Sequence, residues 1–309
     1  MESDFGANTF FLLAKPLSAT TESHPNYPER NQGSMNNLTK QLKNVNTLMN
    51  LTFLGTGPST GIPKKECRDL ICQEARKKSS KSKRTRSSAL LKANNFNLLI
   101  DCSPDFLQQV KQERIKKINY VIITHAHRDA SGGIKKLNLW TKNKIIVCCQ
   151  KQTIKKITSR YRGLNKLEFR AIKPYQKFKI KNLAITALPV KHYVLDEKNF
   201  PTLAYKFKNF IYCSDVIKIP TKSLKHFKDC PNLILDAAMY FKRQFISHLN
   251  TRQAIELAQK QKVKKLYLTQ IGHSYPPYKI AGKEIARFVK AHKIKTKVFL
   301  AYDGLKIKL

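Results

Sequence analysis

The segment 124–130, with the sequence THAHRDA, constrains this chain more than any other stretch. It follows the short apolar run 120–123, which predicts a buried strand. His125, His127 and Asp129 therefore alternate along the turn where that strand ends. Neutral imidazole nitrogens and carboxylates are the ligands that bind divalent metals in proteins. Chance clustering is the alternative, but only 8 of the 309 residues are histidine, so the pattern favours a metal site.

Four more potential ligands follow apolar runs further along the chain: His192, Asp215, Asp236 and Gln270. Each alone is typical of a turn or a helix cap. Polar residues that repeatedly end buried strands gather at one edge of a sheet, where sites form. Their order after the histidine motif therefore indicates a single site.

The composition sets limits on domains and on membrane association. The length suits one large α/β domain or two small ones. No apolar run is long enough to span a bilayer, and the short run 10–14 follows acidic residues, unlike a signal peptide. We therefore expect a cytoplasmic protein without a membrane partner. Residues 1–48 are polar and lack periodicity, which predicts a disordered leader before a domain at 49–309.

Charge and cysteine content bear on the partners and on the redox setting. The formal net charge of +39 attracts polyanions, so nucleic acid is a possible partner. The lysines are spread along the whole chain, however, and a general bias toward lysine would produce the same charge without any functional meaning. The densest basic run, 76–86, predicts a loop or helix end that could contact phosphate. The seven cysteines are odd in number and lie mostly in apolar, strand-like surroundings, which argues against a disulfide framework in a cytosolic chain of this size. Cys148 and Cys149 are expected to be buried.

Apolar runs predict mostly strands, with helices between some of them. The expected strands are 51–54, 88–91, 96–101, 120–123, 144–149, 183–188, 203–207, 210–213, 233–235 and 265–269. The expected helices are 106–117, 250–260 and 283–290, with Thr251 as the candidate cap of the second. This order is compatible with two sheets packed face to face and helices outside.

The histidine motif resembles the signature of the metallo-β-lactamase superfamily, a strand followed by His-x-His-x-Asp-His, with Ala130 in place of the last histidine. From Leu51 onward the chain resembles the phosphoribosyl 1,2-cyclic phosphate phosphodiesterases of the carbon–phosphorus lyase pathway and their tRNase Z-like relatives. The segments that match are 54–57, 124–129, 188–192, 214–215, 247–250, 269–273 and 302–304. The resemblance implies an α/β fold, the αββα sandwich of two packed mixed β-sheets with helices outside.

The resemblance also implies two metals that share one aspartate. The ligands of the first metal would be His125, His127, His192 and Asp215, which are all present. Those of the second would be Asp129, Asp215 and the residues at Ala130 and Gln270, where the family has histidines. Alanine cannot bind a metal, and a glutamine oxygen is a weak ligand for zinc but suits harder ions. The chain therefore holds one tight divalent metal (zinc or manganese), gains a weak second metal with its substrate, or is catalytically impaired.

A second ligand set is implied by the structural zinc site of the same family, which is built from three cysteines and a histidine. The positions that align with it are Cys67, Asp69, Cys72 and His273, with Asp69 in place of the middle cysteine. Such a set could bind zinc tetrahedrally through one oxygen, one nitrogen and two sulfurs. The alternative is two free thiols in a loop.

The resemblance implies hydrolysis of a small anionic phosphodiester, such as a cyclic ribose phosphate. His248 aligns with the family's catalytic histidine and would protonate the leaving oxygen, and Asp129 would hold the attacking water. The helix expected at 250–260 should lower the tendency of His248 to charge. Lysines and arginines around the cleft would hold the phosphate. A catalytically impaired RNA-binding relative and an RNA-processing nuclease are the alternatives, and a homodimer remains open.

Overall fold

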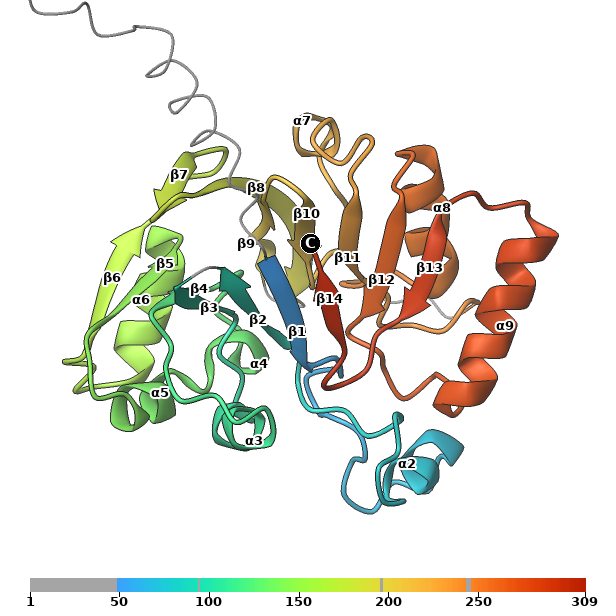
Figure 1. The fold of residues 1–309 in the computed structure, drawn as a ribbon, viewed down its shortest axis with the longest axis horizontal. Helices are drawn as coiled ribbons and strands as arrows, with labels where there is room; N and C mark the ends of the chain where they lie inside the picture. The colour runs from blue at the N-terminus through green and yellow to red at the C-terminus, as the bar shows by residue number, and fades with distance from the viewer. Residues whose placement is uncertain (1–48, 94, 195–196, 243–245) are drawn as a thin grey trace, which may run out of the picture. The chain divides into compact units, whose positions relative to one another are not determined.

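The computed structural model describes residues 49–309, except 94, 195–196 and 243–245, so the predicted leader lies outside the described residues. Two seven-stranded sheets form its centre (Figure 1). The first sheet has the order β14 (Lys306–Lys308), β1 (Met49–Gly55), β2 (Ser88–Ala93), β3 (Phe96–Ile100), β4 (Tyr120–Ile122), β5 (Ile145–Cys149) and β6 (Leu167–Ala171). The second has the order β13 (Lys297–Leu300), β12 (Lys265–Thr269), β11 (Asn232–Asp236), β10 (Phe210–Cys213), β9 (Glu197–Lys206), β8 (Leu183–Val194) and β7 (Lys177–Ile180).

Alternation of side chains along each strand places apolar residues on both faces of both sheets. In β12, Tyr267 belongs to the apolar cluster between the sheets, whereas Leu266 and Leu268 belong to the cluster under the outer helices. In β1, Phe53 packs between the sheets and Leu54 packs on the opposite face. A strand that is buried on both faces has a continuous apolar sequence, which is why apolar runs predict these strands.

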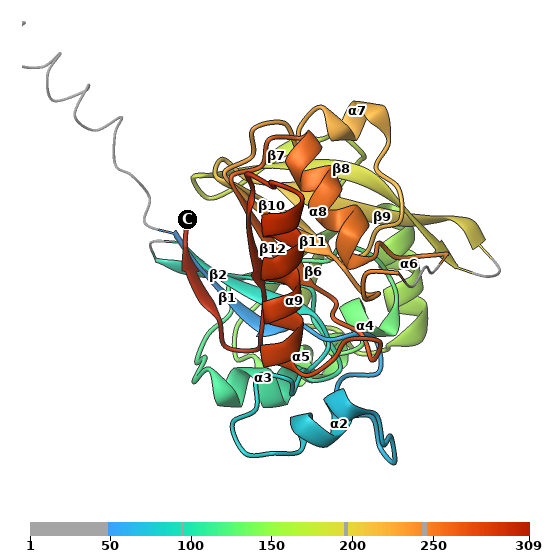
Figure 2. The ribbon, with the colours of Figure 1, turned by 90° about the vertical axis from the view of Figure 1, so that its right-hand side faces the viewer.

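Helices cover the two outer faces and complete four layers (Figures 1 and 2). The first sheet is covered by α3 (Phe106–Gln112), α5 (Ile134–Trp140) and α6 (Lys151–Arg160). The second is covered by α8 (Thr251–Lys260) and α9 (Tyr278–Ala291). The short helices are α2 (Leu70–Ala75), α4 (Arg128–Ser131) and α7 (Thr221–Leu224). The predicted αββα sandwich is thereby confirmed. Within the described part of the chain, no helix combines the length and apolarity that crossing a bilayer requires.

Several predicted boundaries differ from the structure. The helix expected at 106–117 ends at Gln112, because Arg114 adopts a left-handed backbone with φ 50°. Thr251 was the wrong cap: Asn250 is the N-cap of α8 and forms a capping box with Gln253. The strand expected at 183–188 continues to Val194 because it pairs with β9 along that length. Cys148 and Cys149 are buried, as predicted.

Candidate metal centre

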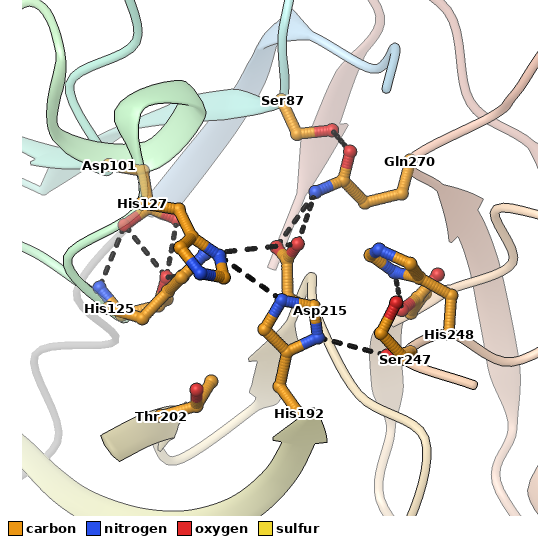
Figure 3. Close-up of polar contacts among 12 residues, drawn as sticks. Ser87, Asp101, His125, His127, His192, Thr202, Asp215, Ser247, His248 and Gln270 are labelled. Atoms are coloured by element: carbon orange, nitrogen blue, oxygen red, sulfur yellow. Dashed lines mark hydrogen bonds and ion pairs between the residues drawn. The ribbon is translucent and has the colours of Figure 1, made fainter. Parts of the chain in front are cut away.

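Parallel strand pairing brings the predicted ligands together. β3, β4 and β5 are parallel in the first sheet, and β10, β11 and β12 are parallel in the second. His125 and His127 follow β4, and Asp215 follows β10, so they lie at the carboxyl ends of strands from both sheets. Their side chains point toward one another (Figure 3). His192 lies within β8 rather than after a strand, opposite Phe200 of β9.

Three histidines and one aspartate converge in a buried cluster. The candidate ligand atoms of His125, His127 and His192 lie within 4.8 Å of one another. His127 Nδ1 is 3.2 Å from His192 Nε2, close to the roughly 3.3 Å between two nitrogens that bind one tetrahedral zinc at about 2.05 Å. His125 Nε2 is 4.0 Å from Asp215 Oδ1. The Phe200 ring stacks on His127 with centroids 4.0 Å apart and walls one side of the cluster.

Hydrogen bonds behind the cluster fix which nitrogens carry lone pairs. The Nδ1 atom of His192 is 2.9 Å from the carbonyl oxygen of Ser247, which can only accept, so Nδ1 carries the proton and Nε2 carries the lone pair. The Nδ1 atom of His125 lies 2.8 Å from Thr124 Oγ1. A proton on Nδ1 satisfies this contact, and the Thr124 hydroxyl in turn donates to Asp101 at 3.0 Å.

The surroundings of the Nε2 atom of His125 show whether the site fits a metal. This atom is buried and has no hydrogen-bond partner among the described residues. A buried N–H without a partner would be costly, whereas a lone pair aimed into a cluster of ligands is what metal coordination uses. The residues present therefore fit one divalent ion held by His125, His127, His192 and Asp215.

Burial sets the charges that such an ion needs. Desolvation lowers the pKa of His125 and of His127 to about 4, so both rings are neutral near pH 7. Burial acts to raise the pKa of Asp215, but the neighbouring histidines outweigh it and hold that pKa below the usual range. Neutral imidazoles beside an ionised carboxylate form a typical ligand set for zinc or manganese.

His248 differs from the other histidines because it pairs with Asp236 at the end of β11. Its Nδ1 lies 2.7 Å from Asp236 Oδ2, and the backbone N–H groups of Val216 and Ala238 donate to the same carboxylate. Burial lowers the pKa of His248, but Asp236 outweighs burial and raises it to about 9. The expectation that the helix end keeps His248 uncharged is therefore wrong. Although its ligand atom lies near those of His192 and Asp215, a protonated ring has no lone pair to offer a metal.

The three residues expected around a second metal, unlike the first set, do not present a converging group of ligand atoms. Asp129 lies in α4, is partly buried, and has a pKa raised by burial and by the charge of Asp215. Ala130 is buried and offers no ligand. Gln270 donates from Nε2 to both oxygens of Asp215, at 2.8 Å each (Figure 3).

A cleft of about 290 Å³ opens beside the cluster. Its lining consists of Pro58, Ser59, Asp129, Ala238, Met239, His248, Gln270, Gly272, His273 and Ser274. None of these described residues is a lysine or arginine, so the expectation of basic residues around the phosphate is not met here. Within the basic run 76–86, Arg84 is buried and donates to Thr56 Oγ1 and to the carbonyl of Ala301, which makes it structural.

The second ligand set is partly assembled. His273 Nδ1 lies 3.2 Å from Cys72 Sγ and 3.9 Å from Cys67 Sγ. Its Nε2 is 3.1 Å from the carbonyl oxygen of Gly61, which assigns the proton to Nε2 and the lone pair to the cysteine side. Asp69 is exposed before α2 and is not among the atoms that converge. The structure thus brings together three of the four predicted ligands.

Sequence reasoning missed the residues that support the cluster. Asp101 follows β3 and could have been found by the same strand-end signal as Asp215. Thr124 precedes the first histidine, but its role needs the three-dimensional contact to Asp101. No sequence signal identifies Ser87, which donates to Gln270 across the two sheets.

The match to a family model settles the assignment. Residues 96–271 match the model described as "Beta-lactamase superfamily domain". The chain belongs to this superfamily. The predicted resemblance is thereby confirmed, and superfamily membership together with the histidine–aspartate cluster supports divalent metal binding and a metal-dependent hydrolase.

Solved structures share the fold. A new diphosphatase from the PhnP family is 23% identical, with a TM-score of 0.73 over 85% of this chain and 97% of that one. Zn²⁺-bound PqqB from Methylobacterium extorquens is 17% identical, with a TM-score of 0.71 over 84% of this chain and 100% of that one. The short form of human tRNase Z is 17% identical, with a TM-score of 0.58 over 84% of this chain and 98% of that one.

A curated relative carries a different name. An octanoyltransferase from Porphyromonas gingivalis (strain ATCC BAA-308 / W83) is 27% identical over 269 residues, which cover 83% of this chain and 51% of the relative. The chain thus spans about half the length of this relative.

Proposed function

We propose that the protein is a metal-dependent phosphodiesterase that hydrolyses a small phosphodiester monoanion, such as a cyclic ribose phosphate. One observation carries the proposal: a buried His–Asp ligand set adjoins a separate, charged His248–Asp236 pair, and His248 lines the cleft that opens beside this set. The first set suits one divalent metal, and the second suits proton donation. The two sets come from different elements, so His248 could donate a proton beside the candidate metal ligands without being one of them.

The ligands of the metal would be His125, His127, His192 and Asp215. When bound there, a divalent metal supplies a Lewis acid and lowers the pKa of a neighbouring water. The chain's own task is to present the lone pairs of these imidazoles. Burial lowers the pKa of His125 and of His127 and so keeps their rings neutral near pH 7, and the contacts to Thr124 and to the Ser247 carbonyl orient His125 and His192.

His248 would act as the general acid. Asp236 keeps its ring protonated near neutral pH and fixes its orientation through Nδ1. A positioned acid of this kind donates a proton to the leaving oxygen as the P–O bond breaks, and contributes typically 10²- to 10⁴-fold to the rate. Asp129 lines the same cleft and would hold the attacking water and accept its proton.

The charge of the cleft supports a diester over a monoester. A phosphodiester carries one negative charge, whereas a phosphomonoester carries close to two near pH 7. Among the described residues that line the cleft, His248 carries a positive charge and Asp129 is a carboxylic acid, and none is a lysine or arginine. A divalent metal at the ligand set would add positive charge, but Asp215, Asp236 and Asp129 oppose it, and no lysine or arginine among the described lining residues would compensate the second charge of a dianion.

A panel of substrates tests the proposal. The full chain, loaded with Mn²⁺ or Zn²⁺, is assayed with bis(4-nitrophenyl) phosphate, a 1,2-cyclic ribose phosphate and 4-nitrophenyl phosphate. We expect hydrolysis of the diesters, at least roughly tenfold faster than that of the monoester, and loss of at least about a hundredfold in His248→Ala. Equal or faster monoester hydrolysis would refute the diester assignment.

RNA is the second candidate substrate or ligand, favoured by the net charge of +39 and by the fold shared with tRNase Z. Filter binding of tRNA at several salt concentrations tests it, because phosphate contacts make affinity fall steeply with salt. An octanoyl thioester belongs in the same assay panel because of the name of the curated relative. Thioester hydrolysis without diester hydrolysis would replace the proposed reaction by acyl chemistry.

A further inference from the structure

Gln270 is held in an unusual position at the end of β12. Its backbone has φ 60°, in the left-handed region that residues other than glycine rarely adopt. Its side chain is only 3% exposed and points to Asp215 (Figure 3). Ten described non-glycine residues have positive φ, and Gln270 is the one among them that hydrogen-bonds to Asp215, which makes it a candidate for a functional role.

The orientation of the Gln270 amide follows from its partners. A carboxylate can only accept, so the nitrogen must be the atom that lies 2.8 Å from each oxygen of Asp215. The amide oxygen then accepts from the Ser87 hydroxyl at 3.1 Å. Ser87 immediately precedes β2 in the first sheet, and Gln270 follows β12 in the second, so this chain of bonds joins the two sheets.

A second metal does not fit the residues present. In a two-metal site the shared aspartate must offer an oxygen to each ion. Here, both oxygens of Asp215 receive N–H groups from Gln270, whose partial positive charge faces the carboxylate where a second ion would bind. Ala130 is 4% exposed and offers only a methyl group at the other expected ligand position.

We infer that Gln270 takes the place of a second cation: its amide, anchored by Ser87, neutralises and orients Asp215 toward the three histidines and keeps the centre mononuclear. Gln270 is therefore a positioning residue. The inference rests on the first metal of the proposed function, but not on the substrate or on the reaction. Hydrogen bonds to an ionised carboxylate are among the strongest that proteins make, which suits a fixed replacement for an ion.

Metal binding without substrate tests this inference. Mn²⁺ is chosen because the thiolates of the Cys67–Cys72 cluster favour softer metals. The full chain is titrated with Mn²⁺, with stoichiometry followed by elemental analysis and by electron paramagnetic resonance. We expect one Mn²⁺ per chain in the cleft, with the signal of an isolated ion. Two cleft ions with a spin-coupled signal would overturn the inference, as would the absence of any bound ion.

Two substitutions separate the parts of the inference. Gln270→Met keeps the length but cannot donate, so the affinity for the single Mn²⁺ should fall about tenfold to a hundredfold, the usual effect of losing a partner behind a ligand. Gln270→Glu places a carboxylate against Asp215, so a second Mn²⁺ should bind. Gln253→Glu is the matched control, because it adds the same charge within the capping box of α8, where glutamate is also tolerated.

The outcomes distinguish this inference from the proposed function. Unchanged Mn²⁺ affinity in a folded Gln270→Met protein would overturn the positioning role, whatever the protein hydrolyses. Ser87→Ala should lower the affinity in the same direction by a smaller factor, and gives a second test if Gln270→Met is unfolded by circular dichroism. One bound Mn²⁺ without diester hydrolysis would support the inference and refute the phosphodiesterase assignment alone.

Discussion

The Nδ1 atom of His248 lies 2.7 Å from Oδ2 of Asp236, and the backbone N–H groups of Val216 and Ala238 hold that carboxylate in place. The pair comes from the end of β11 and from the segment before α8, which carry none of the four candidate metal ligands. It gives His248 a charge near pH 7 that His125 and His127, whose pKa burial lowers to about 4, lack. This difference leads to a specific pH dependence.

The diesterase rate should fall at alkaline pH. Protonated His248 is the active form, and its pKa of about 9 means that the acid is present below pH 9 and lost as the pH rises through that value. Asp236→Asn removes the charge that raises this pKa, so the alkaline limb of kcat should move to lower pH. A pH–rate profile of both proteins checks the shift. An unchanged limb in Asp236→Asn would exclude His248 as the titrating acid.

Thr124→Val should weaken metal binding without creating a cavity in the core. Valine keeps the shape of Thr124 but cannot accept from His125 Nδ1 or donate to Asp101. The proton of His125 then has no fixed site, and the affinity for Mn²⁺ or Zn²⁺ should fall about tenfold to a hundredfold. Isothermal titration calorimetry measures the change, with Thr158→Val, at an exposed threonine of α6, as the control. Equal affinities in the two variants would contradict this role of Thr124.

The cysteine cluster should bind one zinc in addition to the cleft. His273 Nδ1 and two sulfurs already converge, and a fourth ligand from solvent or from Asp69 would complete a tetrahedron. Cys72→Ser should therefore lose one zinc equivalent by elemental analysis. Cys230→Ser, at a buried cysteine near the start of β11, is the matched control and should keep full zinc content. The prediction fails if both variants hold the same zinc.

Restoring two imidazoles should restore a second metal. The double variant Ala130→His with Gln270→His removes the amide from Asp215 and supplies two new ligands. Diesterase activity should rise by at least roughly tenfold, because a second Lewis acid would face the leaving oxygen. Activity at saturating metal is measured beside the metal content. A second bound ion without a gain in rate would show that this chain does not use two metals.

Local patterns in the sequence predicted the strands and the gathering of possible ligands at one sheet edge, whereas the αββα sandwich and the first ligand set followed from the resemblance to the metallo-β-lactamase superfamily. Apolar runs mark the strands, and parallel strands place His125 and Asp215 at one edge. Contacts between elements could not be predicted in this way. The bond from Ser87 to Gln270 depends on how the two sheets pack, and the charge of His248 depends on Asp236, twelve residues earlier in the chain. Arg84 belongs to the basic run that is expected to contact phosphate, but its side chain is buried and donates to a backbone carbonyl and a hydroxyl group.

The central claim is that a single metal in the cleft drives phosphodiester hydrolysis. Metal-free full-length protein is titrated with Mn²⁺ while hydrolysis of bis(4-nitrophenyl) phosphate is followed, with His127→Ala alongside. We predict no hydrolysis before Mn²⁺ is added and a linear rise of the rate that ends when one Mn²⁺ per chain occupies the His–Asp ligand set. His127→Ala should show no hydrolysis at the same Mn²⁺ concentrations. Activity without metal, a break at two equivalents, or full activity in His127→Ala would contradict the claim.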